Sequence, residues 1–407
     1  MSTKSLYTFT LISLINFLLA AAMGLLLRYA FISEIPFNFN YLLHAHSHVA
    51  ALGWAYQMIC VFLVFYFIRE DSGLFKKLFW VTQISVFGMM LSFPFQGYGS
   101  VSIPFSTLHI ICSYIFIFYI WKNAQYNFIS EKIILRAALI FLAISTLGIW
   151  MLGPSIVMYG KNSVLYQISI QFYLHFQFSG WFIFAMVALL IRYFSKQLSF
   201  ELSPKTIQIL IIFLIVSVPL SFALVLFWFF KNDVWILLNM LTVITQLLLV
   251  IFILSRLKGI LSFFRQQNKT IRLFFILGLL SLILKVLFQA FTAIPEIALL
   301  SHQVRNYSVG YIHLIMLGFV SSVLLVFIFE ILKIKLNLAA KFGIWLFLIG
   351  FILSELMLFV QGILFSSGLG QLNYYHEFLF VVSSLMFLAV TLITYTIIST
   401  GLKIKSD

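Results

Sequence analysis

Charged residues are scarce in this chain, since only 9% of its 407 residues are Asp, Glu, Lys or Arg and 63% are hydrophobic. A soluble domain carries roughly 25% charged residues, so the composition excludes an ordinary soluble fold. Cysteine is scarcer still. Cys60 and Cys112 both lie in apolar runs and provide no disulfide framework. These shortages indicate an integral membrane protein.

Twelve apolar runs are long enough to cross a bilayer, for which about 20 residues are needed. They cover approximately residues 8–30, 43–68, 77–95, 101–121, 132–152, 165–193, 206–229, 234–256, 270–294, 308–332, 342–365 and 374–400. No connecting segment is long enough to form a soluble domain. The sequence therefore predicts an all-α integral membrane fold of twelve transmembrane helices, with residues 1–407 as one polytopic domain.

The net charge of +14 follows the predicted topology and does not indicate a nucleic-acid surface. Most lysines and arginines lie near the N-terminus, after even-numbered helices, or in the C-terminal tail. Examples are Lys76, Lys196, Arg265 and Lys405. By the positive-inside rule both termini are cytoplasmic. We expect a multi-pass protein of a bacterial inner membrane, with the lipid bilayer and not nucleic acid as its partner.

One short pattern occurs three times: a histidine, four residues, a glycine and an aromatic residue. The copies begin at His48, His175 and His313, in the second, sixth and tenth predicted helices. Four helices return the chain to the same side of the bilayer, so the copies would be parallel repeats, unlike the inverted repeats of many transporters. The approximate repeat boundaries are 1–130, 131–260 and 261–407.

All the histidines fall in the predicted outer half of the membrane or in outer loops. Ionisable groups inside a bilayer are costly and are therefore functional candidates. The alternative for each is a neutral imidazole bonded to a neighbouring helix, or, for His44 and His302, a place in the wet interface. The candidate metal ligands are His44, His109, His175 and His376.

The segment LHAHSHVAALGW places His44, His46 and His48 together at the start of the second helix. Residues two apart on a helix point in nearly opposite directions, whereas residues four apart share a face. His46 and His48 would therefore serve two different sites, and His44 would lie above His48. Neutral imidazole suits haem iron and copper. Zinc hydrolysis is disfavoured because no HExxH motif occurs.

The His-x-His pair, followed by an aliphatic stretch and a Gly-aromatic step, resembles a ligand helix of the haem-copper oxidase subunit I superfamily. It also resembles the second-helix motif of the NnrS family of twelve-helix haem and copper proteins. The resemblance implies three four-helix arcs and one or two haems, and it allows for copper. By the same resemblance His46 and His48 would be axial haem ligands and His313 a partner ligand. His175 would take the copper-ligand position of the sixth helix.

Two arginines at the outer end, Arg28 and Arg305, would hold haem propionates in this family, and interfacial snorkelling is the alternative. Two features of the oxidases are missing. The seventh predicted helix has no histidine, and Ser179 stands where a cross-linkable tyrosine would follow the sixth-helix histidine. Oxygen reduction at a full binuclear centre is therefore not expected, and whether the protein is an enzyme stays open.

The resemblance implies electron transfer or handling of NO or O2 near the outer face, with a redox protein or quinol as partner. The alternative is a twelve-helix transporter or proton-coupled channel whose path the histidines line. The parallel repeat and the one-sided histidine layer favour the first function. Lys285 and Glu355, in the ninth and eleventh helices, would pair with each other, line a proton path or meet a propionate.

Overall fold

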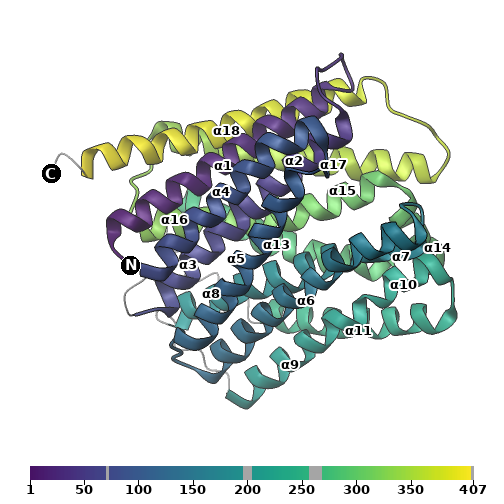
Figure 1. The fold of residues 1–407 in the computed structure, drawn as a ribbon, viewed down its shortest axis with the longest axis horizontal. Helices are drawn as coiled ribbons and strands as arrows, with labels where there is room; N and C mark the ends of the chain where they lie inside the picture. The colour runs from purple at the N-terminus through teal and green to yellow at the C-terminus, as the bar shows by residue number, and fades with distance from the viewer. Residues whose placement is uncertain (70–72, 196–203, 256–267, 405–407) are drawn as a thin grey trace. The chain divides into compact units, whose positions relative to one another are not determined.

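The structure is a computed structural model that describes residues 1–69, 73–195, 204–255 and 268–404 (Figure 1). Within these ranges all regular secondary structure is helical. Lys196, Arg265 and Lys405, which contribute to the predicted cytoplasmic charge, lie outside the described residues.

The described residues form a succession of helices, and three segments among them, η1 to η3, are π-helical. In chain order they are α1 (Thr3–Tyr29), α2 (Phe39–His48), η1 (Val49–Tyr56), α3 (Gln57–Phe67), α4 (Gly73–Gln96), α5 (Ser102–Asn123), α6 (Ile129–Tyr159), α7 (Val164–His175), η2 (Phe176–Phe182), α8 (Ile183–Ser195), α9 (Pro204–Ser221), α10 (Ala223–Phe230), α11 (Asp233–Ser255), α13 (Lys269–Phe291), α14 (Pro295–Gln303), α15 (Arg305–His313), η3 (Leu314–Ser321), α16 (Ser322–Ile331), α17 (Leu338–Ser366) and α18 (Tyr375–Ile404).

Among the described residues, 12 helical stretches are long and apolar enough to cross a membrane, which confirms the predicted fold class. The bounds agree within a few residues: the second span covers Phe39–Phe67 and the last Tyr375–Thr400. Lipid offers backbone groups no water to bond, so an apolar run of this length must satisfy its hydrogen bonds within a helix. Composition alone therefore decides these elements.

Polar side chains fix where two of the spans begin. Asn38 Oδ1 accepts hydrogen bonds from the backbone N–H groups of Asn40 and Tyr41 at the start of α2. Ser163 Oγ accepts one from the N–H of Tyr166 at the start of α7. Such caps satisfy first-turn donors that have no partner within the helix. Both capped helices lead into a copy of the histidine pattern.

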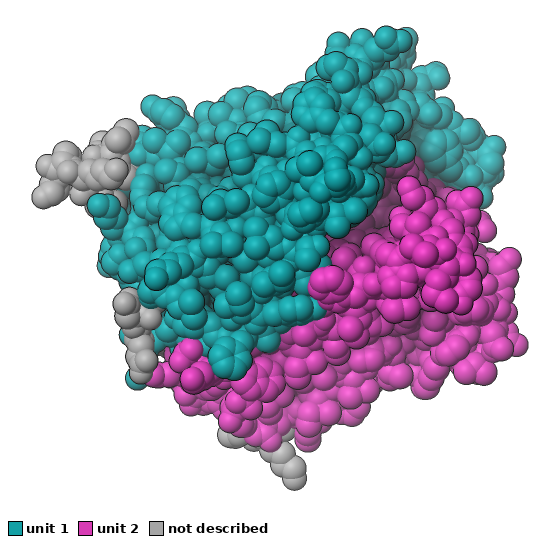
Figure 2. Space-filling view, viewed as in Figure 1, with its two compact units in different colours: residues 1–120, 269–278, 316–407 teal, residues 121–268, 279–315 magenta. Residues whose placement is uncertain are grey.

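The chain divides into two compact units, coloured separately in Figure 2. Unit 1 comprises residues 1–120, 269–278 and 316–407, and unit 2 comprises residues 121–268 and 279–315. Within unit 1, α18 packs along α1 and α17, and α2 packs against α4 (Figure 1). Within unit 2, α6 packs against α7 and α8, and α9 packs against α11. The helices that carry candidate ligands are thereby held by neighbours in their own unit.

Candidate functional site

The second, sixth and tenth spans each change from α to π geometry directly after the histidine of the repeated pattern. The π segments are Val49–Tyr56, Phe176–Phe182 and Leu314–Ser321. Well under 1% of residues in globular proteins are π-helical, and such segments occur frequently at functional sites. The same uncommon geometry in the same register at all three copies makes each of these histidines a candidate functional residue of its own unit.

The glycine of the pattern lets a neighbouring helix approach the π segment closely. A Cβ atom on Gly53 would lie 2.8 Å from Cγ1 of Val86, and one on Gly180 would lie 2.6 Å from Cβ of Phe141. Both distances are shorter than side chains tolerate, so glycine is needed at both positions. Asn16 also donates from Nδ2 to the Gly53 carbonyl at 2.9 Å, which ties α1 to η1.

Within unit 1 the first and third π segments are joined by a buried hydrogen bond. The indole N–H of Trp54 donates to Ser321 Oγ at 2.8 Å. Ser321 Oγ in turn donates to the Met316 carbonyl, five residues back, at 2.7 Å. Phe17 stacks on the Trp54 ring with centroids 4.6 Å apart. Ser321 therefore has two roles. Its hydroxyl accepts the hydrogen of the buried Trp54 indole, and its bond to the Met316 carbonyl stabilises the π-helical backbone.

His46 faces α1. Its Nδ1 lies 2.9 Å from the Ala20 carbonyl oxygen, and its ring lies against Gly24, where a Cβ atom would be 2.9 Å from Cε1. A carbonyl oxygen only accepts hydrogen bonds, so Nδ1 carries the hydrogen and the lone pair is on Nε2. Metal-bound histidines have this arrangement, with the second ring nitrogen donating to a carbonyl.

His48 faces α4 and the connection that follows it. Its Nδ1 lies 2.8 Å from the His44 carbonyl, so Nε2 again carries the lone pair, which faces the Tyr98 hydroxyl at 3.3 Å. The Phe93 ring lies 4.6 Å from the His48 ring, and Tyr98 lies 4.8 Å from the His44 ring. His44 and His48 therefore share one face of the helix and His46 takes another, as the spacing predicts. Because Tyr98 is exposed in a connecting segment, a ligand of His48 could replace its hydroxyl.

The end of α1 that leads into α2 places a positive charge within electrostatic range of His46. The guanidinium of Arg28, one helical turn beyond Gly24, acts electrostatically on His46, Glu355 and His376. The ring of His376 stacks on Phe31 with centroids 4.5 Å apart. Arg28 therefore lies within electrostatic range of His46, and its role in holding a propionate stays a prediction.

His109 is buried in α5, with only 3% of its surface exposed. Its Nε2 has no hydrogen-bond partner among the described residues, and its ring contacts Tyr56 at 4.8 Å. His109 also lies within electrostatic range of His48 in the same unit. A buried imidazole nitrogen without a partner suits a ligand or a water molecule.

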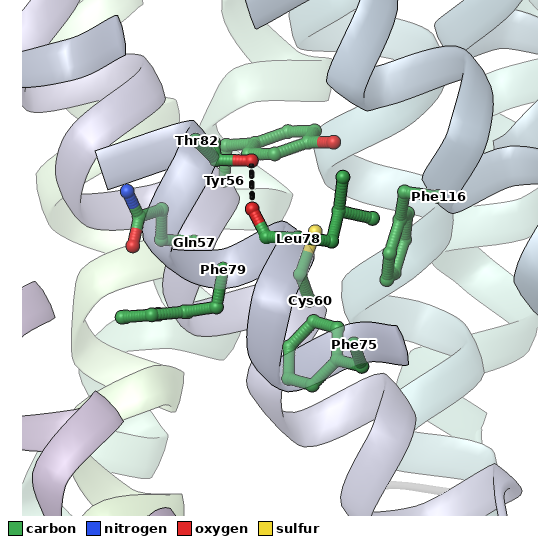
Figure 3. A pocket seen from close by; sticks show the side chains of 8 residues that line it. All are labelled: Tyr56, Gln57, Cys60, Phe75, Leu78, Phe79, Thr82 and Phe116. Carbon is green, nitrogen blue, oxygen red and sulfur yellow. Dashed lines mark hydrogen bonds between the residues drawn. The ribbon is translucent and has the colours of Figure 1, made fainter. Parts of the chain in front are cut away.

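Tyr56 also lines a small internal cavity of unit 1 (Figure 3). Its lining residues are Tyr56, Gln57, Cys60, Phe75, Leu78, Phe79, Thr82 and Phe116. The hydroxyl of Thr82 is turned back to the Leu78 carbonyl at 2.8 Å, as the dashed line shows. Gln57 Oε1 is buried and has no partner within the described ranges. The cavity has room for about one water molecule.

In unit 2, His175 has the opposite hydrogen-bond pattern to His46 and His48. Its Nε2 lies 2.9 Å from the Val218 carbonyl and 3.3 Å from Ser221 Oγ. The helix is interrupted between α9 and α10 at this point. The Phe222 N–H donates to the Pro219 carbonyl, so the Val218 carbonyl lacks this helical donor. The freed carbonyl takes the histidine hydrogen, so the lone pair of His175 is on Nδ1.

The other predicted residues of unit 2 lie along the tenth span and before it. His313 is the last residue of α15, immediately before η3. Arg305 is exposed and begins the same helix. His302 lies in the short helix α14, where its ring stacks on Trp228 at 4.8 Å. His302 therefore packs against an aromatic side chain outside the repeated pattern.

The donor set fits haem better than a metal ion held only by side chains. No group of three or more His, Cys, Asp or Glu side chains in the described part of the chain is arranged to hold a metal ion. Haem needs only one or two imidazoles, because its macrocycle supplies the other iron ligands. His46 and His48 each carry their lone pair on Nε2. Haem binding by these two residues and copper binding by His44, His109, His175 or His376 both stay predictions.

Sequence reasoning located the pattern but missed the π segments, the Trp54–Ser321 bond and the orienting carbonyl of Ala20. The available signal was the recurrence of the glycine five residues after each histidine. No protein-family model matches the chain, and no curated protein sequence matches it. The candidate site therefore rests on its own geometry.

Proposed function

We propose that the chain is a membrane haem protein that transfers electrons or handles a diatomic gas near the outer face of the membrane. The observation that carries the proposal is that His46 and His48 each donate from Nδ1 to a main-chain carbonyl and so present Nε2. This is the form of imidazole that binds haem iron, with its orientation fixed by the second hydrogen bond.

His46 and His48 would each hold haem from a different side of the second span. Arg28 supports the first of these sites, because its charge lies within reach of His46 and suits a propionate. His313 as a partner ligand, and Arg305 as a second propionate-binding residue, stay predictions. Histidine-ligated haem supplies one-electron chemistry and binding of diatomic gases.

The protein's own residues would set the environment of the bound group. Phe93 walls the His48 side with an aromatic ring, and Tyr98 offers a hydroxyl that can donate to a ligand. A redox protein or a quinol would supply electrons, and both termini would lie in the cytoplasm of a bacterium. The twelve apolar spans of the described residues support a location in a membrane. That this membrane is a bacterial inner membrane is part of the proposal.

Matched alanine variants test the proposal. In the purified full chain, His46→Ala and His48→Ala are expected to lose or shift a Soret band, because each removes an axial ligand. Ser47→Ala is the control, since Ser47 lies between the two histidines and is exposed. Its hydroxyl donates to the His44 carbonyl at 3.0 Å and lies 3.5 Å from Nδ1 of His48, a nitrogen that keeps its own bond to the same carbonyl in the variant.

Haem-to-protein ratios and absorption spectra of the four proteins decide the outcome. Unchanged spectra in both histidine variants, with folded protein by circular dichroism, would reject these residues as ligands. A colourless and stable wild-type preparation would favour a transporter whose path the histidines line.

A further inference from the structure

Lys285 is a buried amine in the outer part of a membrane span that the haem proposal does not use. It is 4% exposed in α13, and about 9 Å of helix separates it from the end of the span at Phe291. Its Nζ donates one hydrogen bond, of 2.7 Å, to Gln289 Oε1. An ammonium group has three donors, so two remain for another acceptor.

Among the described residues of unit 2, the contacts of the Lys285 amine are with a neutral amide and an aromatic ring and include no acid. The Tyr311 hydroxyl donates to the same Gln289 oxygen at 3.5 Å, and its ring centroid lies 5.8 Å from Nζ. The His175 imidazole lies within electrostatic range of Lys285. All of these groups are neutral or positive, so they do not offset the charge of the amine.

The described carboxylates of unit 2 are used elsewhere. Glu131 pairs with Arg192 at 2.7 Å, where both side chains are buried. Asp233 and Glu296 are exposed in the first turns of α11 and α14, whereas Lys285 is buried. A buried charge without a counter-charge is costly, and ionisable groups in a membrane interior are functional candidates.

We propose that Lys285 forms a binding site for a small monovalent anion, to which the Tyr311 hydroxyl turns its single hydrogen from the long 3.5 Å bond to Gln289. One anion would neutralise the one ammonium and accept its two remaining hydrogens. The depth of the amine below the end of the span requires a small ligand such as a halide or formate. The site is independent of haem, because its residues are not among the proposed iron ligands.

Thermal unfolding of the purified full chain in detergent tests this site with sodium chloride and sodium formate as probes. Sodium gluconate, at the same ionic strength, is the control because its anion is bulky. We expect chloride or formate to raise the unfolding midpoint of wild type in a saturable way, and gluconate not to do so. Equal midpoints in the three salts would overturn the proposal without reference to any variant.

The variant Lys285→Met keeps the length of the side chain and removes its charge. Loss of a charge-assisted bond should weaken the apparent anion affinity roughly ten- to a hundredfold, whereas Lys285→Arg should retain a saturable response. Lys161→Met, in an exposed turn, is the charge-matched control and should respond like wild type. A saturable response of the same affinity in Lys285→Met would place the anion elsewhere and overturn the assignment. If that variant does not fold, Tyr311→Phe takes its place, and an unchanged affinity there would exclude the tyrosine.

Discussion

At the scale of single residues, the imidazole of His46 is placed by two small residues of α1. Ala20 supplies the carbonyl that accepts the Nδ1 hydrogen, and Gly24 leaves space for the ring. Both lie on one face of α1 because they are four residues apart. The orientation of a proposed iron ligand thus depends on a helix that contributes no ligand itself.

Gly24→Ala should therefore destabilise the protein although alanine is the better helix former. Its Cβ atom would lie 2.9 Å from Cε1 of His46, so the ring must swing away and lose its bond to Ala20. We expect a loss of about 1–2 kcal/mol in the free energy of unfolding, with a weaker Soret band. Chemical unfolding in detergent measures the first effect.

Gly153→Ala is the matched control, because a Cβ atom at this position would meet no atom within 4 Å outside the two neighbouring residues and the backbone of its own helix. The gain in helix propensity is offset by the following Pro154, which disfavours helical backbone before it, so the change should stay within about 1 kcal/mol of wild type. If the two substitutions change the free energy of unfolding equally, the close contact between His46 and Gly24 does not contribute to stability.

His302, which lies outside the spans, makes stability depend on pH. Burial lowers the pKa of His302 from its ordinary value of 6.5. Below that value the unfolded chain binds a proton that the folded chain does not, so stability falls as the pH drops from 6.5 toward the folded pKa. His302→Phe keeps a ring against Trp228 and removes the titration.

The stability difference between His302→Phe and wild type should therefore grow in favour of the variant as the pH is lowered from about 8 to about 5. Thermal unfolding at several pH values measures it. A difference that stays constant, or that shrinks toward low pH, would contradict the effect of burial on this imidazole.

At the scale of elements, the three π segments distinguish this chain from a simple bundle of apolar α-helices. Each follows a pattern histidine, and in unit 1 two of them are joined through Trp54 and Ser321. A π segment shifts the register of the helix, so the face on which the histidine lies is set relative to the residues after it. The bond between the segments therefore stabilises the position of the proposed ligand helix.

Ser321→Ala should cost about 1–3 kcal/mol, because it leaves the buried Trp54 indole without its acceptor. The loss of the bond to the Met316 carbonyl adds to that cost. In a Trp54→Phe background only the second loss remains, so Ser321→Ala should cost less there. A double-mutant cycle of unfolding free energies measures the difference, and additive costs would mean that the hydrogen bond contributes nothing.

At the scale of the whole molecule, the twelve-helix class follows from composition, while the site depends on details that composition does not determine. The second span is predicted at 43–68 and observed at Phe39–Phe67, because an apolar run in lipid has few alternatives to a helix. The opposite directions of His46 and His48 follow from helical periodicity. The π geometry after His48 does not follow from the sequence. One added residue per turn changes the backbone hydrogen bonds but leaves the apolar pattern unchanged. The link between Ser321 and Trp54, distant in sequence, is likewise set by packing.

The even number of spans and the distribution of basic residues predict that both termini are cytoplasmic. A fluorescent protein fused to the C-terminus should fluoresce in bacteria, and alkaline phosphatase fused there should be inactive. Phosphatase inserted in the turn at 160–163, between α6 and α7, should be active. The reverse pattern would turn the histidine layer to the cytoplasmic side and contradict the proposed outer location.

The most direct measurement of the central claim is the optical spectrum of the purified wild-type protein, oxidised and reduced, together with its haem content. Our account predicts a Soret band and at least about one haem per chain, bound through histidine. A folded, colourless protein that contains no haem, and takes up none when haem is supplied, would contradict it.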